Sequence, residues 1–155
     1  MSEAARRPSD PLADDQLDAL VAEFYASISG PAGPRDWERD RAIFHPAARL
    51  MRTGIDDAGR PWVKVMSLAE YAADTAAFFA SGDFYEIEVA RRVDRFGNIA
   101  HVRSVYEARR HPAAAELLKR GVNSIQLFHD GDRWWVLAVL WDNERPGVTV
   151  PVEWR

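Results

Sequence analysis

The sequence predicts an α+β fold in which three helices pack on a strongly curved, mostly antiparallel sheet of about six strands. Two observations predict this class. Apolar residues recur at helical spacing in the first half of the chain, and four long β-type segments joined by short connections fill the second half. The length of 155 residues suits one domain. We therefore expect a flexible tail over 1–10, a single domain over 11–145 and a C-terminal tail over 146–155.

The first helix is expected to begin at Asp10 or near Asp14 and to end at Gly30. Its apolar stripe follows the i, i+3, i+4 rule and consists of Leu17, Leu20, Val21, Phe24, Tyr25 and Ile28. Asp36 is placed to cap a short second helix that runs to about Phe44.

A capping box marks the third helix, because Ser67 and Glu70 stand three residues apart at the start of an apolar stripe. Gly82 is expected to end this helix. Two short strands, over 47–53 and 61–66, are expected between the second and third helices.

Four longer strands follow, over 84–93, 99–109, 122–128 and 134–141. The dipeptide Asp130-Gly131 is a strong signal for a hairpin between the last two. The 111–121 segment is expected to be a connection with room for a helical turn.

Strand residues alternate between the two faces of a sheet, so the first long hairpin divides into an apolar face and a charged face. The apolar face, expected to meet the helices, carries Tyr85, Ile87, Val89, Arg91, Val93, Ala100, Val102, Ser104, Tyr106 and Ala108. The opposite face, which includes Glu86, Glu88 and His101, is expected to meet water.

The last hairpin is apolar on both faces, although helices can cover only one of them. We therefore predict a homodimer through the outer face of these two strands. The predicted interface consists of Gln126, Phe128, Trp135, Leu137, Val139 and Trp141. The alternative is that the C-terminal segment 148–154 folds back over this face.

Composition argues against several classes of protein. The net charge is −4 with acids and bases interspersed, which argues against a nucleic-acid partner. No run approaches the roughly 18 apolar residues of a membrane span, and the start of the chain lacks the apolar run of a secretory signal. The absence of cysteine fits a reducing compartment, so a cytoplasmic location is expected. No histidine pair has metal-ligand spacing and no phosphate-binding glycine loop appears, so no metal or other cofactor is expected.

Phe24 and Tyr25 close the first helix, and Asp-Gly-Asp-Arg-Trp at 130–134 introduces the last strand. Together with the order of the elements, these residues resemble the nuclear transport factor 2-like superfamily. The segments 121–127 and 141–144 are similar to bacterial SnoaL-like members of unassigned function. The resemblance covers about residues 14–145.

The resemblance implies the cystatin-like, cone-shaped α+β fold, whose helices and sheet enclose a pocket. Relatives include steroid isomerases, scytalone dehydratase, polyketide cyclases and epoxide hydrolases, while others only bind ligands or hold complexes together. The fold therefore does not choose the function.

Isomerases and dehydratases of this kind take a proton beside a carbonyl and stabilise the resulting oxyanion in a dry site. We predict Asp142 as the acid–base residue, because it follows the apolar strand end at Trp141, where desolvation would raise its pKa. Tyr106, or else Tyr71 or Tyr25, is predicted to donate a hydrogen bond to the oxyanion. The alternative for Asp142 is a solvated acid at a strand end.

Six further residues are assigned to the pocket: Tyr25, Tyr71, Arg91, Ser104, Asn123 and His45. The tyrosines lie on apolar stripes and would otherwise be ordinary core residues. Arg91 would clamp an anionic ligand or form a salt bridge at the pocket rim. His45 would reach the rim or serve a structural role at the end of a helix.

The sequence thus favours a protein with a hydrophobic pocket for an apolar small molecule and, if it is an enzyme, cofactor-free isomerisation, dehydration or cyclisation. Two alternatives stay open. One is a non-catalytic dimeric module for ligand binding or association, and the other is a small subunit that partners a ring-hydroxylating oxygenase.

Overall fold

The computed structural model describes residues 10–155 of the chain. These residues form α1 (Asp10–Ile28), α2 (Trp37–Arg41), β1 (Phe44–Ile55), β2 (Pro61–Met66), α3 (Leu68–Ala80), β3 (Tyr85–Phe96), β4 (Ile99–Arg109), β5 (Lys119–His129), β6 (Trp134–Asn143) and a 3₁₀ turn (Val152–Trp154). The tail expected over 1–10 lies outside the described residues except for Asp10, which begins α1.

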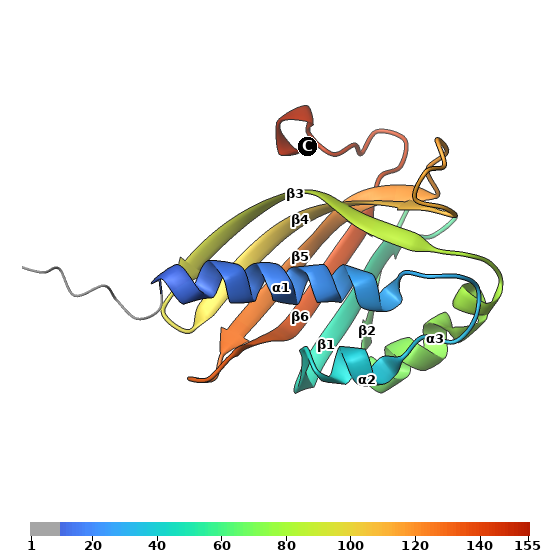
Figure 1. Cartoon of the computed structure of the whole chain (residues 1–155). Coiled ribbons are helices and arrows are strands. Elements are labelled where there is room, and N and C mark those ends of the chain that lie inside the picture. The colour runs from blue at the N-terminus through green and yellow to red at the C-terminus, as the bar shows by residue number, and fades with distance from the viewer. Residues whose placement is uncertain (1–9) are drawn as a thin grey trace, which may run out of the picture.

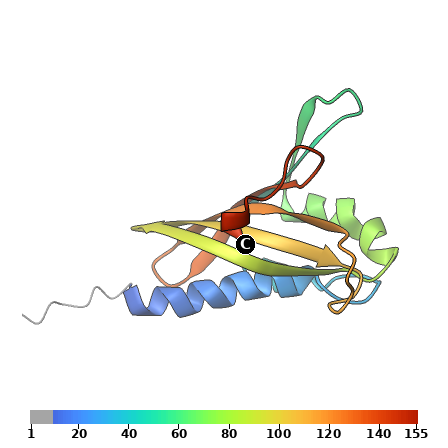
Figure 2. The same ribbon diagram turned by 90° about the horizontal axis from the view of Figure 1, so that it is seen from above.

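The six strands form one mixed sheet in the order β2-β1-β6-β5-β4-β3. Neighbouring strands are antiparallel except β1 and β6, which are parallel. Figure 1 shows α1 lying across one face of the sheet, with α2 and α3 beside β1 and β2. In Figure 2, α1 runs along one side of the strands and the β1–β2 hairpin projects away on the opposite side. The α+β class and the mostly antiparallel sheet agree with the prediction.

The apolar stripe predicted for α1 is confirmed, because each of its six residues is at most 9% exposed. The stripe meets the inner faces of β1, β4, β5 and β6 in the main core. Complete burial of such side chains contributes about 1.5–3 kcal/mol each. The long first helix therefore docks on the sheet through its periodicity.

The predicted caps of the two short helices are also present. The Asp36 side chain accepts a hydrogen bond from the Glu38 amide, and Ser67 and Glu70 form the reciprocal capping box of α3. The second helix is shorter than predicted and ends at Arg41. Phe44 already belongs to β1, where it pairs with Val136 of β6.

A β-bulge in β3 changes which side chains face the helices. Glu88 pairs with Tyr106 of β4, but the next paired residue is Ala90, so Val89 is inserted as an extra residue. An extra residue reverses the alternation of faces. Ile87 and Val89 are 42% and 40% exposed, whereas Glu86 is 9% exposed. The prediction that Ile87 and Val89 face the core is therefore wrong, and Glu86 takes the inward position.

A second bulge reverses β6 in the same way. Gln126 pairs with Ala138 while Leu127 pairs with Val136, so Leu137 is the extra residue. Beyond the bulge Val139 and Trp141 pack inward, and Val139 is only 1% exposed. Their assignment to the dimer interface is wrong.

The rest of the predicted interface lies on the outer face, but part of it is covered by the chain itself. His45 packs edge-on between the rings of Phe128 and Trp135, and the Arg133 guanidinium lies 3.8 Å from the Trp135 ring centroid. Gln126 is exposed, and Leu137 is 38% exposed.

The C-terminal segment folds back over another part of the outer face. The Arg103 guanidinium of β4 lies 3.7 Å from the ring centroid of Trp154. Val150 is buried, and its amide donates a hydrogen bond of 2.9 Å to Glu144. The Trp154 contact lies over β4, whereas the alternative weighed for this segment was that it covers the last two strands. Val63 and Val65 of β2 and Leu140 of β6 stay exposed.

The connection before β5 contains turns rather than a helix, and β5 begins at Lys119, three residues earlier than predicted. This early start brings Lys119 into the sheet. Among residues 10–155, no helix has the length and apolarity needed to cross a membrane.

Candidate functional site

A cavity of about 310 Å³ lies between the three helices and the inner face of the sheet. It is lined by Phe24, Ile28, Asp40, Phe44, Leu50, Arg52, Tyr71, Asp74, Thr75, Phe78, Phe79, Phe84, Glu86, Tyr106, Lys119, Asn123, Val139 and Trp141. Most of this wall is aromatic or aliphatic, with a few charged groups inserted in it. Such a wall is typical of small-molecule sites, in which a few polar groups orient an apolar ligand.

Glu86 is the carboxyl that the bulge of β3 turns into this cavity. It pairs with the fully buried Ala108 of β4, and its backbone amide donates a hydrogen bond of 3.0 Å to Ser29 Oγ. Burial raises the pKa of Glu86 to about 7, and the charge of Lys119 lowers it by less. A carboxyl with this pKa exchanges protons readily at neutral pH.

Lys119 is the cation whose charge acts on the pKa of Glu86. Its Nζ lies 5.3 Å from the ring centroid of Phe84 and 5.8 Å from that of Phe78. Burial lowers the pKa of Lys119, while the field of Glu86 raises it. A carboxylate and an ammonium thus share an aromatic environment, where electrostatic interactions are stronger than in water.

Asp40 is a second carboxyl in the cavity wall. It lies in α2, is 1% exposed, and its Oδ1 accepts a hydrogen bond of 2.9 Å from Ser27 of α1. Its Oδ2 has no hydrogen-bond partner among the described residues. Burial raises the pKa of Asp40 to about 6, against the effect of the Ser27 hydroxyl.

Charged groups at the edge of the cavity are paired with one another. Asp74 of α3 accepts hydrogen bonds from Arg52 of β1 and from Lys64 of β2. These two cations, with Lys64 contributing more, lower the pKa of Asp74. The Arg52 guanidinium also lies 5.6 Å from the ring centroid of Trp141. One carboxylate between two cations leaves an excess of positive charge at this edge.

The two tyrosines of the cavity differ in what their hydroxyls do. Tyr106 donates to the Asn143 side chain, so its single proton is already engaged. It reaches this position because Gly121 lies beside it, and a Cβ at Gly121 would meet the Tyr106 hydroxyl at 2.3 Å. Tyr71 lines the cavity. Burial, and to a smaller extent the charges of nearby carboxyls, raise its pKa, and no hydrogen bond within residues 10–155 contributes to this shift. Tyr71 is therefore the better placed donor to a ligand.

Tyr25 and Ser104 form a buried chain of hydrogen bonds behind the cavity. Ser104 donates to Glu88, so its own oxygen accepts the proton of Tyr25 at 2.6 Å. The Tyr25 oxygen in turn accepts from Asn123 Nδ2 at 3.0 Å. Only Asn123 of these three predicted pocket residues lines the cavity. The chain holds the Asn123 amide in one orientation.

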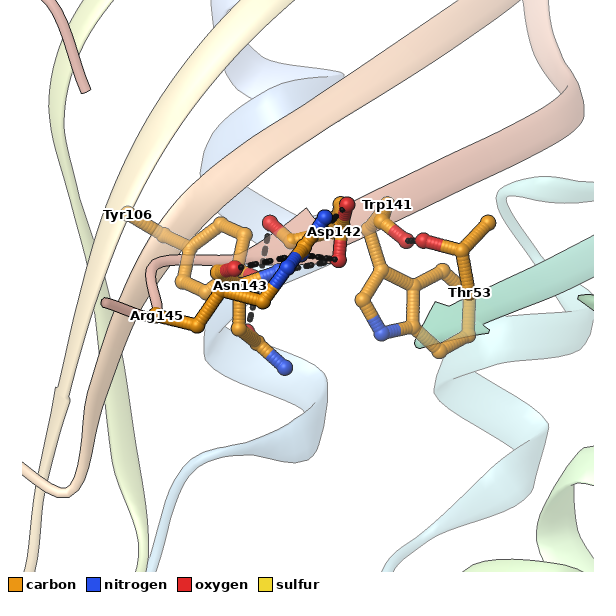
Figure 3. Close-up of polar contacts among 6 residues, drawn as sticks. All are labelled: Thr53, Tyr106, Trp141, Asp142, Asn143 and Arg145. Atoms are coloured by element: carbon orange, nitrogen blue, oxygen red, sulfur yellow. Dashed lines mark hydrogen bonds and ion pairs between the residues drawn. The ribbon is translucent and has the colours of Figure 1, made fainter. Parts of the chain in front are cut away.

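The predicted catalytic Asp142 does not line the cavity. Its carboxylate accepts two hydrogen bonds of 2.9 Å from Arg145, and its side chain is 45% exposed. Figure 3 shows this pair at the end of β6, with the Tyr106 hydroxyl directed at Asn143 and the Asp142 backbone. The bulge in β6 gives the inward position to Trp141. The alternative, an acid at the strand end outside the cavity, describes Asp142.

Arg91 and His45 also lie away from the cavity wall. Arg91 forms ion pairs with Glu88, at 2.7 Å, and with Asp18 of α1. This is the salt bridge weighed as its alternative role. His45 packs on the outer face against Phe128 and Trp135, because it follows Phe44, which is buried on the inner face.

The sequence analysis missed Glu86, Asp40 and Lys119. Glu86 was assigned to the wet face because strict alternation was carried through the bulge. Asp40 lies in a helix of 5 residues, which is too short for the spacing of apolar residues to indicate its buried side. Arg91 and Val93 gave no sign of the bulge, because they lie beyond it and keep the predicted face, paired with Ser104 and Val102.

No group of three or more histidine, aspartate or glutamate side chains within residues 10–155 is arranged to hold a metal ion. The polar groups of the cavity suit an organic ligand, because three carboxyls, an ammonium, a guanidinium and two phenols are distributed around an aromatic wall.

No family model matches the chain, and no curated protein matches it. Solved structures do match its fold. A protein of unknown function with a cystatin-like fold from Nostoc punctiforme superimposes with a TM-score of 0.66 at 12% identity, over 87% of this chain and 93% of that one. The resemblance in fold expected from the sequence is confirmed.

Two other similar structures carry names that suggest an activity. A candidate dehydratase of the nuclear transport factor 2-like family from Streptomyces avermitilis gives a TM-score of 0.63 at 16% identity, over 88% of this chain and 99% of that one. A candidate ketosteroid isomerase from Shewanella frigidimarina gives 0.55 at 18% identity, over 80% and 92%. At these identities the likeness establishes the fold alone.

Proposed function

We propose that the protein binds a compact apolar carbonyl compound in the cavity and catalyses cofactor-free proton transfer on it. The observation that carries the proposal is a buried carboxyl, Glu86, that faces an aromatic cavity and has a pKa of about 7. Perturbed acids in clefts of this kind mark catalytic sites more often than chance. This places the acid–base role on Glu86 instead of Asp142.

In the proposed step, the Glu86 carboxylate takes a proton from the carbon next to the ligand carbonyl. The bond electrons move to the carbonyl oxygen, which becomes an enolate oxygen. The Tyr71 hydroxyl donates a hydrogen bond to that oxygen, and the Lys119 ammonium stabilises its charge. For isomerisation, protonated Glu86 then returns the proton to another carbon. For dehydration, it instead gives the proton to a β-hydroxyl, which leaves as water as the enolate electrons return to form the new carbon–carbon double bond and the carbonyl.

The size of the cavity limits the ligand. A volume of about 310 Å³ corresponds to roughly ten waters of the liquid. A ligand with one or two rings fits this space, and the aromatic wall favours a flat ligand.

Exchange of carbon-bound hydrogen with solvent tests the proposal. We expect the protein to accelerate deuterium incorporation next to the carbonyl of 2-tetralone in D₂O, followed by nuclear magnetic resonance. Glu86→Gln should lower this acceleration by roughly 100-fold or more, as expected for loss of a general base. Glu116→Gln, at an exposed site outside the cavity, is the matched control. Equal exchange with the wild type and Glu86→Gln would refute the role of Glu86.

A homodimer through the outer face of the sheet is a second proposal, and its interface is now centred on β2 and β6. Val65 of β2 and Leu140 of β6 both pair with Met51 of β1 and therefore share that face, and Val63 lies two residues from Val65 on the same side. Val63, Val65 and Leu140, here called the outer patch, are 57%, 53% and 41% exposed. Contiguous apolar residues of this kind on an uncovered sheet face favour association.

A further inference from the structure

The Oδ2 atom of Asp40 is an acceptor without a donor. Asp40 lines the cavity and is 1% exposed, and its Oδ2 atom has no hydrogen-bond partner among residues 10–155. Buried polar atoms are nearly always hydrogen-bonded, and leaving one unsatisfied is costly. A hydrogen-bond donor on a ligand in the cavity would satisfy this acceptor.

The rest of the Asp40 side chain is held firmly. Ser27 of α1 donates to Oδ1 at 2.9 Å, and its hydroxyl also contacts the Phe24 carbonyl oxygen at 3.2 Å. The backbone of α2 around Asp40 is anchored by the Asp36 cap. The Asp40 carboxyl is consequently held in one orientation, which suits an orienting contact.

Asp40 and Glu86 lie in different elements, α2 and β3, and different charges act on them. The charges that shift the pKa of Asp40 come from Arg39 and Glu23, whereas the charge that shifts the pKa of Glu86 comes from Lys119. Both carboxyls raise the pKa of Tyr71, which lies in the wall with them. A ligand whose carbonyl is beside Glu86 and Tyr71 can thus present another part of its body to Asp40.

We infer that Asp40 binds a hydrogen-bond donor of the ligand, so that the ligand of this cavity is a hydroxylated or amino-substituted ring ketone and not a plain hydrocarbon ketone. This inference rests on the proposed function, because it concerns the same cavity. It adds the second functional group of the ligand and the residue that selects it. Asp40 is a specificity residue, and Glu86 remains the acid–base residue.

A matched series of ligands tests the inference: 6-hydroxy-2-tetralone, 6-methoxy-2-tetralone and 2-tetralone. Dissociation constants are measured by calorimetry with the whole chain. The wild type should bind the hydroxy ketone roughly 10- to 100-fold more tightly than the methoxy ketone, as expected for a hydrogen bond to a charged group. The corresponding 6-amino ketone shows whether the donor is selected as a hydroxyl or as an amine.

The Asp40→Asn variant should remove most of this preference, because the amide keeps an acceptor for Ser27 but offers N–H groups to the cavity. Glu86→Gln should keep the preference for the hydroxy ketone, which separates the role of Asp40 from that of Glu86. Asp40→Leu, which introduces an apolar side chain of similar size, provides a second variant if the asparagine variant does not fold. Circular dichroism confirms the fold of each variant.

The outcomes distinguish the two proposals. If the wild type binds all three ketones equally, or if Asp40→Asn keeps the preference for the hydroxyl, the inference on Asp40 is overturned while catalysis on 2-tetralone still stands. If 2-tetralone shows no catalysed exchange but the hydroxyl preference depends on Asp40, the proposed chemistry fails and the binding site stands.

Discussion

At the scale of single residues, the surroundings of each carboxyl set its pKa. Glu86 and Asp40 are buried, and burial raises the pKa of each to about 7 and about 6. Asp130, in the turn before β6, accepts hydrogen bonds from Trp135 and two backbone amides, which lower its pKa to about 2. The pKa of a carboxyl in this protein therefore depends more on its surroundings than on whether it belongs to aspartate or glutamate.

The raised pKa of Glu86 has a consequence for stability. An acid whose pKa is higher in the folded state than in the unfolded chain is destabilising once it ionises, so stability falls as the pH rises from about 4.5 to about 7. Glu86→Gln removes this penalty. The difference in unfolding free energy between the variant and the wild type should grow across that window by on the order of 3 kcal/mol and then stay level.

Urea unfolding at a series of pH values measures this difference. Glu116→Gln is again the control and should track the wild type at every pH. A difference that is flat from pH 4.5 to pH 8 would show that Glu86 is not desolvated.

At the scale of elements, two bulges decide which side chains meet the ligand. Val89 in β3 and Leu137 in β6 are the extra residues, and each reverses the faces of the strand around it. Without the first, Glu86 would face water. Without the second, Val139 and Trp141 would leave the cavity wall. Both bulges lie beside the cavity, as bulges often do near functional sites.

Alanine replacement tests the position of the bulge in β3. Ile87→Ala should cost less than about 1 kcal/mol, because the structure places this side chain on the outer face. Val102→Ala, at a fully buried position in the adjacent strand, should cost clearly more, on the order of 2 kcal/mol. Chemical denaturation of the two variants provides the comparison. A cost of about 2–5 kcal/mol for Ile87→Ala would place that side chain in the core and remove the bulge.

At the scale of the whole molecule, the two faces of the sheet differ in what packs on them. The inner face carries the cavity and the core. The outer face is partly covered by the C-terminal segment at Arg103 and by the His45 cluster with Phe128 and Trp135. The outer patch over β1, β2 and β6 stays exposed.

The proposed homodimer should depend on the outer patch. The wild type should sediment as a dimer at micromolar concentration, and Leu140→Glu should give monomers because it places a charge among apolar side chains at the interface. Phe96→Glu, which changes an exposed aromatic residue at the β3–β4 turn, should leave the dimer intact. A monomeric wild type would overturn the proposal.

Local features of the fold could be predicted from the sequence. The stripe of α1 is set by spacing within one helix, and the Ser67–Glu70 box involves only four consecutive residues. Both hairpins and the buried face of β4 also followed from local alternation. Tyr71, Tyr106 and Asn123 were placed in the cavity for the same reason, since no bulge interrupts their elements before them.

By itself, then, the sequence determined the elements, their caps and the apolar side of each helix, because these depend on neighbours a few residues away. Only the tertiary structure decided that Glu86, Asp40 and Lys119 share a cavity while Asp142 binds Arg145 outside it. The physical reason is that one extra residue exchanges the two faces of a strand, and the position of that residue is set by pairing with strands distant in sequence.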